Sequence, residues 1–364
     1  MRIAMIGSRG VPAREGGVER VVEALTTELT AAGHEVLVYS RRRYVGPEPY
    51  RGPGQRIITC GLPGKHLDTL THTATAFMDV LRRRVDVIHL HSPGPALWSP
   101  IAAAARIPMV LTVHAPDWRR DKWSLPAKVA VRGGLWLGMR TAKAVTCVSQ
   151  PLANELSQTF GREVLYVPNA PPPAPAGPAG TDLIDSLHLP QGGYGLYVGR
   201  VVPEKRLDLL IGAWKEAAGQ WPLAVAGEVG DDAFGRRCRE LAGPGVKFLG
   251  PRYGGELAQL YENAGFVVHP SALEGMSLVL LEAAAHGKCI LAAETAENSC
   301  FFGDSILYSK VDDFADLSHQ IGRCISGAGM RQSRGLSAQR FAREGTSWAA
   351  VARRMESLYD KAMR

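Results

Sequence analysis

The chain contains 364 residues, of which 46% are apolar and 21% are charged, and these values are typical of a globular protein with two domains of ordinary size. No apolar run reaches the ~20 residues that a membrane-spanning helix needs, because the nearest candidate, 98–113, is interrupted by Pro100, Arg106 and Pro108. The six cysteines are widely spaced and include no C-x-x-C pair, which suggests neither a zinc site nor a disulfide framework. No signal-peptide pattern precedes the first apolar segment, so we expect a cytoplasmic protein with reduced thiols.

The net charge of +7 is unevenly distributed along the chain. Residues 1–170 contain 22 Lys and Arg against 13 Asp and Glu, whereas residues 171–364 contain 20 against 22. Basic clusters lie at 41–43, 82–84 and 119–122. They would attract a phosphorylated acceptor or an anionic lipid surface, and solvated helix ends explain them equally well. No nucleic-acid-binding motif accompanies the charge, so we expect no nucleic acid partner.

The first half of the chain alternates short apolar strands with amphipathic helices. The pattern predicts helices at 18–32 and 67–84, and strands at 2–6, 35–40, 56–60, 86–90, 109–113, 144–148 and 164–167. Near-continuous apolar strands separated by helices are typical of a parallel sheet that is covered on both faces. Right-handed crossovers then give a doubly wound, Rossmann-like α/β domain.

A proline-rich segment, 168–180, contains six prolines and can form neither a helix nor a central strand. We place the domain boundary there and predict one domain at 1–170 and a second at 181–345. The alternation resumes with strands predicted at 194–198, 223–226, 246–249, 266–269 and 288–292. A final helix is predicted within 346–364, with an apolar stripe at positions 348, 351, 355 and 358. Ligands are expected where the carboxyl ends of the two sets of strands face each other.

The most informative segment, 269–282, leads from the end of a strand through a short loop into a predicted helix that carries the apolar run 278–285. The helix is entered through Gly275, Met276 and Ser277, whose backbone N–H groups favour an anion such as a phosphate. Glu282 lies about two turns inside this apolar helix, where a carboxylate needs a partner such as a ribose hydroxyl. A solvated surface glutamate would explain Glu282 alone better. The second acid, Glu274, and the strand–loop–helix context together favour a nucleotide site.

A second group, 199–205, follows the first strand of the second domain. Arg200 and Lys205 both lie between the end of that strand and the next helix, where a diphosphate would bind. Arginine donates two N–H groups to phosphate oxygens, and lysine supplies a compact charge. Alone these would be ordinary surface charges, but beside Glu274 and Glu282 we favour phosphate binding.

The loop 7–19 follows the first strand of the chain. Its glycine spacing and Pro12 do not match a dinucleotide fingerprint, but Gly16 and Gly17 can bring backbone N–H groups close to an anion or a sugar. Glu19 is explained equally well as an acceptor contact and as a favourable charge in the first turn of a helix.

His114 stands at the carboxyl end of the predicted strand 109–113. A lone histidine is more often structural than catalytic. Its position at a strand end, where functional side chains gather, favours the catalytic interpretation.

These four groups together resemble the family 4 retaining glycosyltransferases, which have the GT-B fold of two Rossmann-like domains. Glu274 and Glu282 match the two acids of the Glu-x7-Glu signature, and Arg200 and Lys205 match a Gly-Arg…Pro-x-Lys motif. The resemblance implies that Glu282 holds the nucleotide ribose and that Glu274 contacts the donor sugar. It implies a donor site made of Gly16, Gly17, Arg200, Lys205, Gly275, Met276, Ser277, Leu278 and Glu282.

The resemblance also implies that the final helix, within 346–364, packs back on the first domain. It further implies catalytic and acceptor-binding residues. The catalytic residues are His114, Glu274, Arg200 and Lys205, and the acceptor-binding residues are Glu19, Asp117 and Trp118. The pairs Asp117-Trp118 and Lys122-Trp123, with the segment 89–97, look like a subgroup that includes rhamnosyltransferase-like enzymes of surface polysaccharide assembly. The chain departs from that subgroup at Ala115, where it usually has glycine, and at Ala296, where it usually has proline.

The expected activity is the transfer of a hexosyl group from a nucleotide-diphosphate sugar to an acceptor hydroxyl, with retention of configuration and with no metal or cofactor. Arg200, Lys205 and the helix start would stabilise the leaving diphosphate, and the chain has no Asp-x-Asp motif. A double displacement through Glu274 and a same-face substitution both give retention, and the second is our preferred hypothesis. The expected partners are the donor and a sugar, lipid-linked or small-molecule acceptor, with a peripheral contact between the basic domain and the inner membrane face.

Three alternatives stay open. A nucleotide-sugar epimerase shares the two-domain architecture and would act without an acceptor. An NADP-dependent oxidoreductase could bind a 2′-phosphate at 41–43, although the glycine pattern argues against it. A non-catalytic subunit that binds nucleotide sugars is the third.

Overall fold

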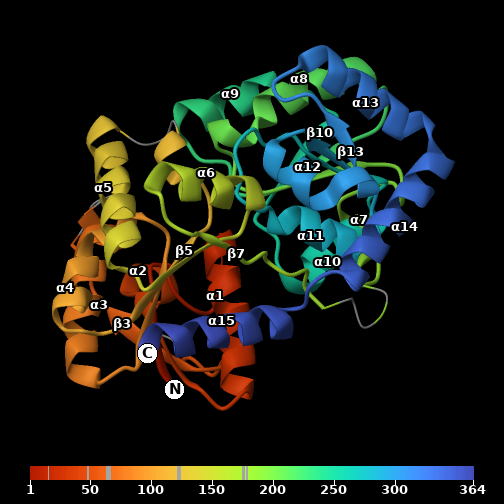
Figure 1. The fold of residues 1–364 in the computed structure, drawn as a ribbon. Helices are drawn as coiled ribbons and strands as arrows, with labels where there is room; N and C mark the ends of the chain where they lie inside the picture. The colour runs from red at the N-terminus through yellow and green to blue at the C-terminus, as the bar shows by residue number, and fades with distance from the viewer. Residues whose placement is uncertain (15, 47–48, 63–66, 121–123, 174–176, 178) are drawn as a thin grey trace. The chain divides into compact units, whose positions relative to one another are not determined.

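The computed structural model describes residues 1–14, 16–46, 49–62, 67–120, 124–173, 177 and 179–364 (Figure 1). The chain divides into two compact units, Met1–Asn169 together with Ser347–Arg364 (unit 1), and Ala170–Thr346 (unit 2). Each unit contains one parallel sheet flanked by helices, which confirms the predicted fold class of two Rossmann-like domains. Glu15 of the glycine-rich loop and the pair Lys122-Trp123 lie outside the described residues.

Unit 1 has a seven-stranded parallel sheet in the order β3-β2-β1-β4-β5-β6-β7. Its strands are β1 (Arg2–Ile6), β2 (Glu35–Arg41), β3 (Gln55–Thr59), β4 (Val87–His91), β5 (Met109–Val113), β6 (Ala144–Cys147) and β7 (Leu165–Tyr166). The strand order reverses between β1 and β4, and ligands of open α/β sheets bind at such switch points. The loop after β1 carries the glycine-rich segment, and β5, the neighbour of β4, leads into His114.

Helices from both ends of the chain cover the sheet of unit 1. They are α1 (Gly17–Ala31), α2 (Arg42–Val45), α3 (Leu67–Arg83), η1 (Gly94–Trp98), α4 (Ser99–Ala104), η2 (Asp117–Arg119), α5 (Leu125–Thr141), α6 (Gln150–Phe160) and α15 (Trp348–Met363). The last helix, α15, returns to unit 1 and packs against α1, β4 and β5 (Figure 1). It buries Val351, Met355 and Leu358 of its apolar stripe.

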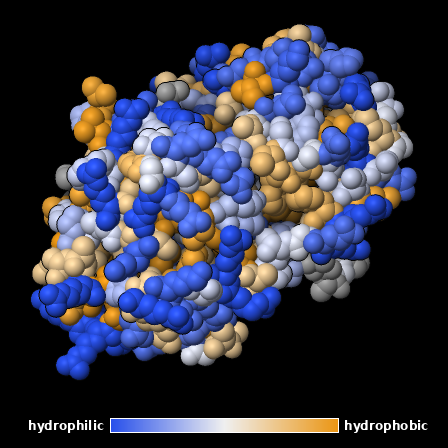
Figure 2. Space-filling view, viewed as in Figure 1, coloured by the Kyte–Doolittle hydropathy of each residue, from blue (hydrophilic) through white to orange (hydrophobic). Residues whose placement is uncertain are grey.

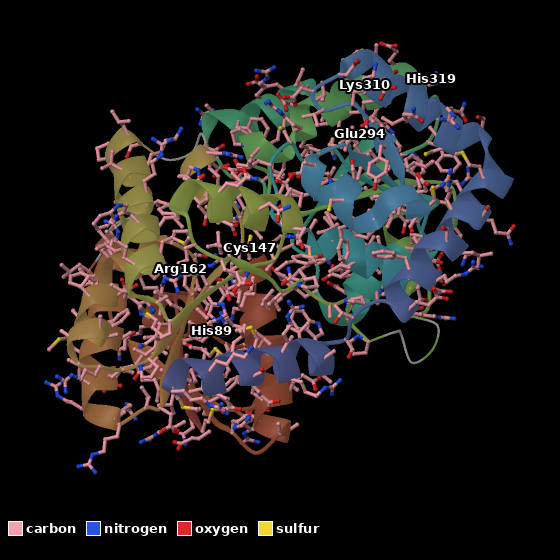
Figure 3. The ribbon with its side chains drawn as sticks, in the orientation of Figure 1. His89, Cys147, Arg162, Glu294, Lys310 and His319 are labelled. Carbon is pink, nitrogen blue, oxygen red and sulfur yellow. The ribbon has the colours of Figure 1, made fainter. Side chains whose placement is uncertain are left out.

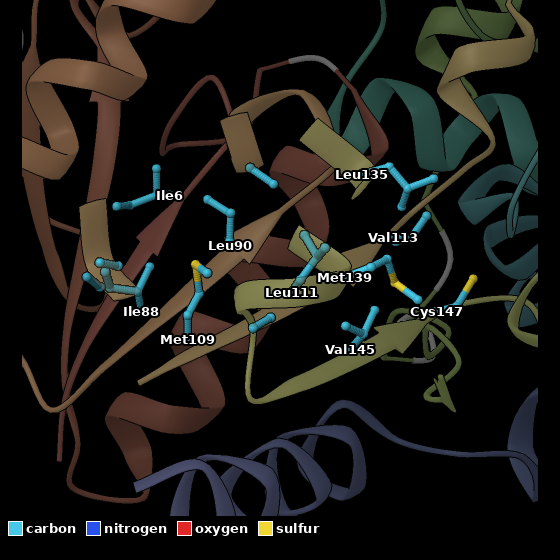
Figure 4. Close-up of a cluster of buried hydrophobic side chains, with 14 of the residues drawn as sticks. Ile6, Ile88, Leu90, Met109, Leu111, Val113, Leu135, Met139, Val145 and Cys147 are labelled. Atoms are coloured by element: carbon cyan, nitrogen blue, oxygen red, sulfur yellow. The ribbon is translucent and has the colours of Figure 1, made fainter. Parts of the chain in front are cut away.

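Apolar side chains from the inner strands and from α5 form the core of one layer of unit 1 (Figure 4). Leu111 on β5 and Met139 on α5 belong to this cluster. Two glycines let α5 approach closely: a Cβ on Gly134 would lie 2.2 Å from the carbonyl oxygen of Pro93, and one on Gly138 would lie 2.6 Å from Leu111 Cδ2. The face of α5 that packs against unit 1 is therefore determined by its two glycines and by its buried apolar side chains.

Unit 2 has a six-stranded parallel sheet in the order β10-β9-β8-β11-β12-β13. Its strands are β8 (Gly195–Val198), β9 (Leu223–Ala226), β10 (Val246–Gly250), β11 (Phe266–His269), β12 (Ile290–Ala293) and β13 (Leu307–Ser309). Its helices are α7 (Asp182–Ser186), η3 (Pro203–Lys205), α8 (Leu207–Ala217), α9 (Ala233–Leu241), α10 (Gly254–Asn263), α11 (Leu278–Ala285), α12 (Ala296–Phe302), η4 (Gly303–Ser305), α13 (Phe314–Ser326) and α14 (Ala328–Glu344). The strand order reverses between β8 and β11, whose carboxyl ends carry the two conspicuous motifs of the second half.

The strands named from the sequence are all present, four of them with the predicted ends and the others with ends that differ by one or two residues. The three-residue β13 was not predicted, because so short a run carries almost no alternation signal. All six cysteines are free thiols, four of them buried. No helix in the part of the chain that the structure describes is both long enough and apolar enough to cross a bilayer.

Candidate functional site

The first candidate site lies at the carboxyl ends of β8 and β11 in unit 2, which are neighbouring strands. The loop after β8 reaches Lys205 in η3, and the loop after β11 reaches Glu274. The carbonyl oxygen of Glu204 accepts hydrogen bonds from Ala272 N at 3.0 Å and from Ser271 Oγ at 3.2 Å. These bonds tie the two loops together, so residues 69 positions apart meet at one point.

Glu274 is at the centre of this site. Its Oε1 accepts hydrogen bonds from Lys205 Nζ and from His269 Nε2, the latter at 3.0 Å, and the residue is 9% exposed. Burial acts to raise the pKa of Glu274, but the charge of Lys205 and the bond from His269 outweigh it and hold that pKa well below its ordinary value. Glu274 is therefore a carboxylate with a paired charge, as a buried acid must be.

His269, the last residue of β11, is fully buried behind Glu274. Its Nε2 lies 3.0 Å from Glu274 Oε1 and 3.1 Å from Ser277 Oγ, while its Nδ1 is buried without a hydrogen-bond partner. Because a carboxylate only accepts, we assign the proton to Nε2. Burial lowers the pKa of His269, so the ring is neutral. The sequence analysis did not select His269, although a polar residue ending an apolar strand was the signal that selected His114.

Ser277 is the N-cap of α11, but its side chain makes no capping bond because its hydroxyl lies against His269. The N–H groups of the first turn thus have no side-chain cap, as an anion-binding helix start requires. Glu282 is the fifth residue of α11, little more than one turn inside rather than two. It is half-buried and accepts a hydrogen bond from Tyr261 at 3.0 Å. Arg200, by contrast, is exposed beyond the end of β8.

The glycine-rich loop of unit 1 is organised around Glu19. The carboxylate of Glu19 accepts hydrogen bonds from Arg9 N at 2.9 Å and from Arg9 Nε at 3.2 Å, and it is 6% exposed. Gly16 has a φ of 91°, and a Cβ there would lie 2.1 Å from Glu19 Oε2. The positive φ therefore favours glycine at this position. Gly17 is the first residue of α1.

His114 follows β5 and belongs to a group of three buried histidines with His89 and His91. His114 Nε2 lies 3.0 Å from His91 Nδ1, and the hydroxyl of Tyr359 on α15 lies 2.7 Å from His89 Nδ1. Figure 3 labels His89, which lies close to α15. His89 Nε2 contacts Thr112 Oγ1 at 2.7 Å. The three rings line a pocket together with apolar side chains of α1 and α15. His89 and His91 entered the sequence analysis only as part of the segment 89–97. That His114 lies beside them follows from the pairing of β4 with β5.

Burial of these three histidines makes the stability of unit 1 depend on pH. It lowers the pKa of His114 to about 4 and of His89 to about 3, and it lowers the pKa of His91 well below its ordinary value. Unfolded histidines titrate near pH 6.5, so below that pH the unfolded state binds protons that the folded state does not. The contribution of these three histidines to the free energy of unfolding should be constant above pH 7. It should then fall towards pH 4 by about 1.4 kcal/mol per pH unit for each histidine.

Thermal unfolding between pH 7.5 and 4.5 tests this expectation. His89→Gln should reduce the slope of Tm against pH, because one buried titrating ring is removed. His319→Gln, a change at an exposed position, is the matched control and should leave the slope unchanged. A Tm that stays flat down to pH 4.5 in the unaltered protein would contradict the expected linkage.

The two predicted acceptor residues in η2 lie in different surroundings. Trp118 is 8% exposed and packs in the core of unit 1, and its role as an acceptor contact stays a prediction. Asp117 is partly exposed and pairs with Arg120 at 2.8 Å. Of this pair, Asp117 alone presents a polar group at the surface.

Two family models match the chain. Residues 15–171 match Glycosyltransferase Family 4, and residues 193–326 match Glycosyl transferases group 1. Glycogen synthase of Mycobacterium tuberculosis is 27% identical, over 100% of this chain and 95% of the relative. D-inositol 3-phosphate glycosyltransferase of Salinispora tropica is 32% identical, over 49% of this chain and 40% of the relative.

Solved structures share the fold over nearly the whole chain. Sucrose-phosphate synthase of Thermosynechococcus elongatus superposes with a TM-score of 0.80 at 21% identity, covering 99% of this chain and 98% of that one. Anabaena HepE, solved in complex with UDP and glucose, has a TM-score of 0.79 at 18% identity and 99% coverage of both chains. The two family models span most of units 1 and 2, and the chain belongs to the family 4 glycosyltransferases, with the GT-B fold.

Proposed function

We propose that this glycosyltransferase moves a hexosyl group from a nucleoside diphosphate sugar to an acceptor hydroxyl, with retention of configuration and without a metal or cofactor. The observation that carries the proposal is the group made by Lys205, Glu274 and His269 beside the uncapped start of α11. It combines a cation and helix N–H groups for a diphosphate with a carboxylate for a sugar. Glu282 lies one turn further along the same helix, where it can hold the ribose.

The nucleotide proposed first is UDP. HepE has been solved in complexes with UDP and with UDP-glucose, and its fold matches this chain along its whole length. A second relative, from Mycobacterium tuberculosis, is named a GDP-mannose-dependent alpha-mannosyltransferase and is 25% identical. GDP is therefore the second nucleotide to test. The narrower likeness to rhamnosyltransferase-like enzymes stays a prediction, since the relatives named above are of other kinds.

The proposed reaction is a same-face substitution. The bond between the anomeric carbon and the diphosphate oxygen breaks, the acceptor oxygen bonds to that carbon, and the acceptor proton passes to the departing phosphate. Negative charge grows on the diphosphate, where Arg200, Lys205 and the N–H groups of Gly275 to Ser277 would stabilise it. Because Oε1 of Glu274 already accepts from Lys205 and His269, the carboxylate is a weak nucleophile, which favours this path over a double displacement.

The acceptor is proposed to bind to unit 1, which carries the excess of basic residues. An acceptor that is a sugar, a lipid-linked sugar or a small phosphorylated molecule suits that charge. Asp117 and Glu19 are the proposed acceptor contacts, and His114 is the proposed contact to the reacting sugar. A peripheral contact of this unit with an anionic membrane is part of the proposal.

A thermal-shift panel of UDP, GDP, dTDP and ADP in EDTA tests the donor site. One nucleotide should stabilise the protein, by about 2.7 kcal/mol at 100 times its Kd, and Glu282→Ala should abolish that shift because it removes the ribose partner. Glu240→Ala, a change to an exposed glutamate of α9, is the matched control and should keep the shift. Stabilisation by none of the four, or only after a metal is added, would contradict the proposal. Conversion of the donor without an acceptor would indicate the epimerase instead.

A further inference from the structure

The outer face of α5 in unit 1 carries large apolar side chains that no other element covers in the part of the chain that the structure describes. Leu125 is 76% exposed, Val129 is 62% exposed and Trp136 is 48% exposed. Their spacing of four and seven residues, with Arg132 between them, puts all of them on one stripe of the helix. The stripe is the most exposed apolar surface of any described helix in unit 1.

The opposite face of α5 already serves the core of unit 1. Val131, Leu135 and Met139 are buried there, and Gly134 and Gly138 let the helix lie close to η1 and β5. A helix that is apolar on both faces normally has a second apolar neighbour. Figure 2 shows hydrophobic atoms over α5, at the upper left, beside strongly hydrophilic ones.

The charges on α5 are all of one sign. Its 17 residues include Lys128, Arg132 and Arg140 and no Asp or Glu. The guanidinium of Arg140 lies 3.8 Å above the ring of Trp136. A tryptophan with an arginine beside it, in line with aliphatic side chains, is suited to the boundary between lipid head groups and acyl chains.

The neighbouring helix α3, which also packs against η1, repeats this combination at its carboxyl end. Met78 is 48% exposed and Leu81 is 40% exposed, directly before the basic run 82–84. Among the residues that the structure describes, twelve large apolar side chains are exposed, and seven of them lie between residues 58 and 136. The exposed apolar side chains and the basic residues are thus concentrated in the same part of unit 1.

We propose that the outer face of α5, residues 125–140, docks on the surface of an anionic lipid bilayer. Leu125, Val129 and Trp136 enter the interfacial region, and the three cations lie among the head groups. A second copy of the chain fits this face less well, since a two-fold contact would bring three cations against three cations. The docking deepens the proposed function because it brings unit 1 to a membrane where a lipid-linked acceptor resides.

Vesicle sedimentation without donor or acceptor tests the docking separately from transfer. The protein should bind vesicles of phosphatidylcholine with 30% phosphatidylglycerol and should not bind phosphatidylcholine alone. Replacing Lys128, Arg132 and Arg140 with Gln should weaken binding ~100-fold, since each cation near such a surface contributes about fivefold. The triple change of Leu125, Val129 and Trp136 to Ser should weaken binding at least tenfold at any salt concentration.

The matched control changes Val311 and Leu336 to Ser, which are exposed apolar residues of unit 2, and it should bind as the unaltered protein does. All variants should keep their circular dichroism spectrum and their nucleotide thermal shift, because the inner face of α5 is untouched. Equal vesicle binding by the triple Ser variant would overturn the proposal, and so would an absence of binding by the unaltered protein. A dimer in sedimentation velocity that the Ser variant abolishes would assign the face to a second copy instead.

Discussion

Lys205→Met should lower kcat/KM for transfer about 10²- to 10³-fold and should also destabilise the protein. The loss of activity follows from the proposed role of Lys205, because the cation proposed to stabilise the leaving diphosphate disappears. The loss of stability follows because Glu274, at 9% exposure, keeps its charge but loses the ion pair, which costs about 3–5 kcal/mol for a buried group. The two effects are measured by steady-state transfer and by urea unfolding.

The double variant Lys205→Met with Glu274→Gln separates these effects. Glutamine removes the unpaired charge and can still accept the bond from His269, so we expect most of the lost stability to return. Activity should not return, because neither the cation nor the carboxylate is restored. Substantial turnover by Glu274→Gln alone would exclude Glu274 as a nucleophile. Full turnover by Lys205→Met would remove Lys205 from the diphosphate site.

Tyr359→Ala should destabilise unit 1 by about 3–5 kcal/mol, the usual cost of removing a buried aromatic ring. Tyr359 is fully buried, and its hydroxyl lies 2.7 Å from His89 Nδ1 on β4. It anchors α15, which packs against α1, β4 and β5 although it is the last helix of the chain. Tyr359→Phe keeps the ring but leaves His89 Nδ1 without its partner, so we expect a smaller loss of about 1–3 kcal/mol.

Hydrogen exchange locates the effect of Tyr359→Ala within the molecule. Amides of α1, β4 and β5 should exchange faster, whereas those of β11 and α11 in unit 2 should be unchanged. Lys361→Ala, a change to an exposed residue of the same helix, is the matched control and should alter neither set. Uniform loss of protection in both units would contradict a role for Tyr359 that is confined to unit 1.

The local parts of the structure follow directly from the sequence. Buried parallel strands consist of continuous apolar residues, so β1, β5 and β11 are recognisable from composition alone. Gly275 to Ser277 mark the start of α11 because a loop with glycine precedes an apolar run. The fold class follows from the same information, since alternating strands and helices allow few arrangements. The short β13 was missed because three residues define no period.

Partners at long range depend on the order of the strands, which no local pattern contains. The sheet order of unit 2 makes β8 and β11 neighbours, and only this brings Lys205 to Glu274 and puts His269 behind them. In unit 1 the pairing of β4 with β5 brings His114 beside His91 of β4, and the return of α15 adds Tyr359 beside His89.

Which side chains are buried also depends on contacts between segments that are far apart in the chain. Trp118 is suited by its chemistry to a sugar site, but packing puts its ring into the core of unit 1. Along α5 the sequence pattern marks apolar residues on both faces, and the contacts with η1 decide which face is left outside. The sequence by itself thus determined the strands other than β13, the fold class and the motif residues. The tertiary structure decided which side chains meet and which are exposed, because both depend on contacts between segments far apart in the chain.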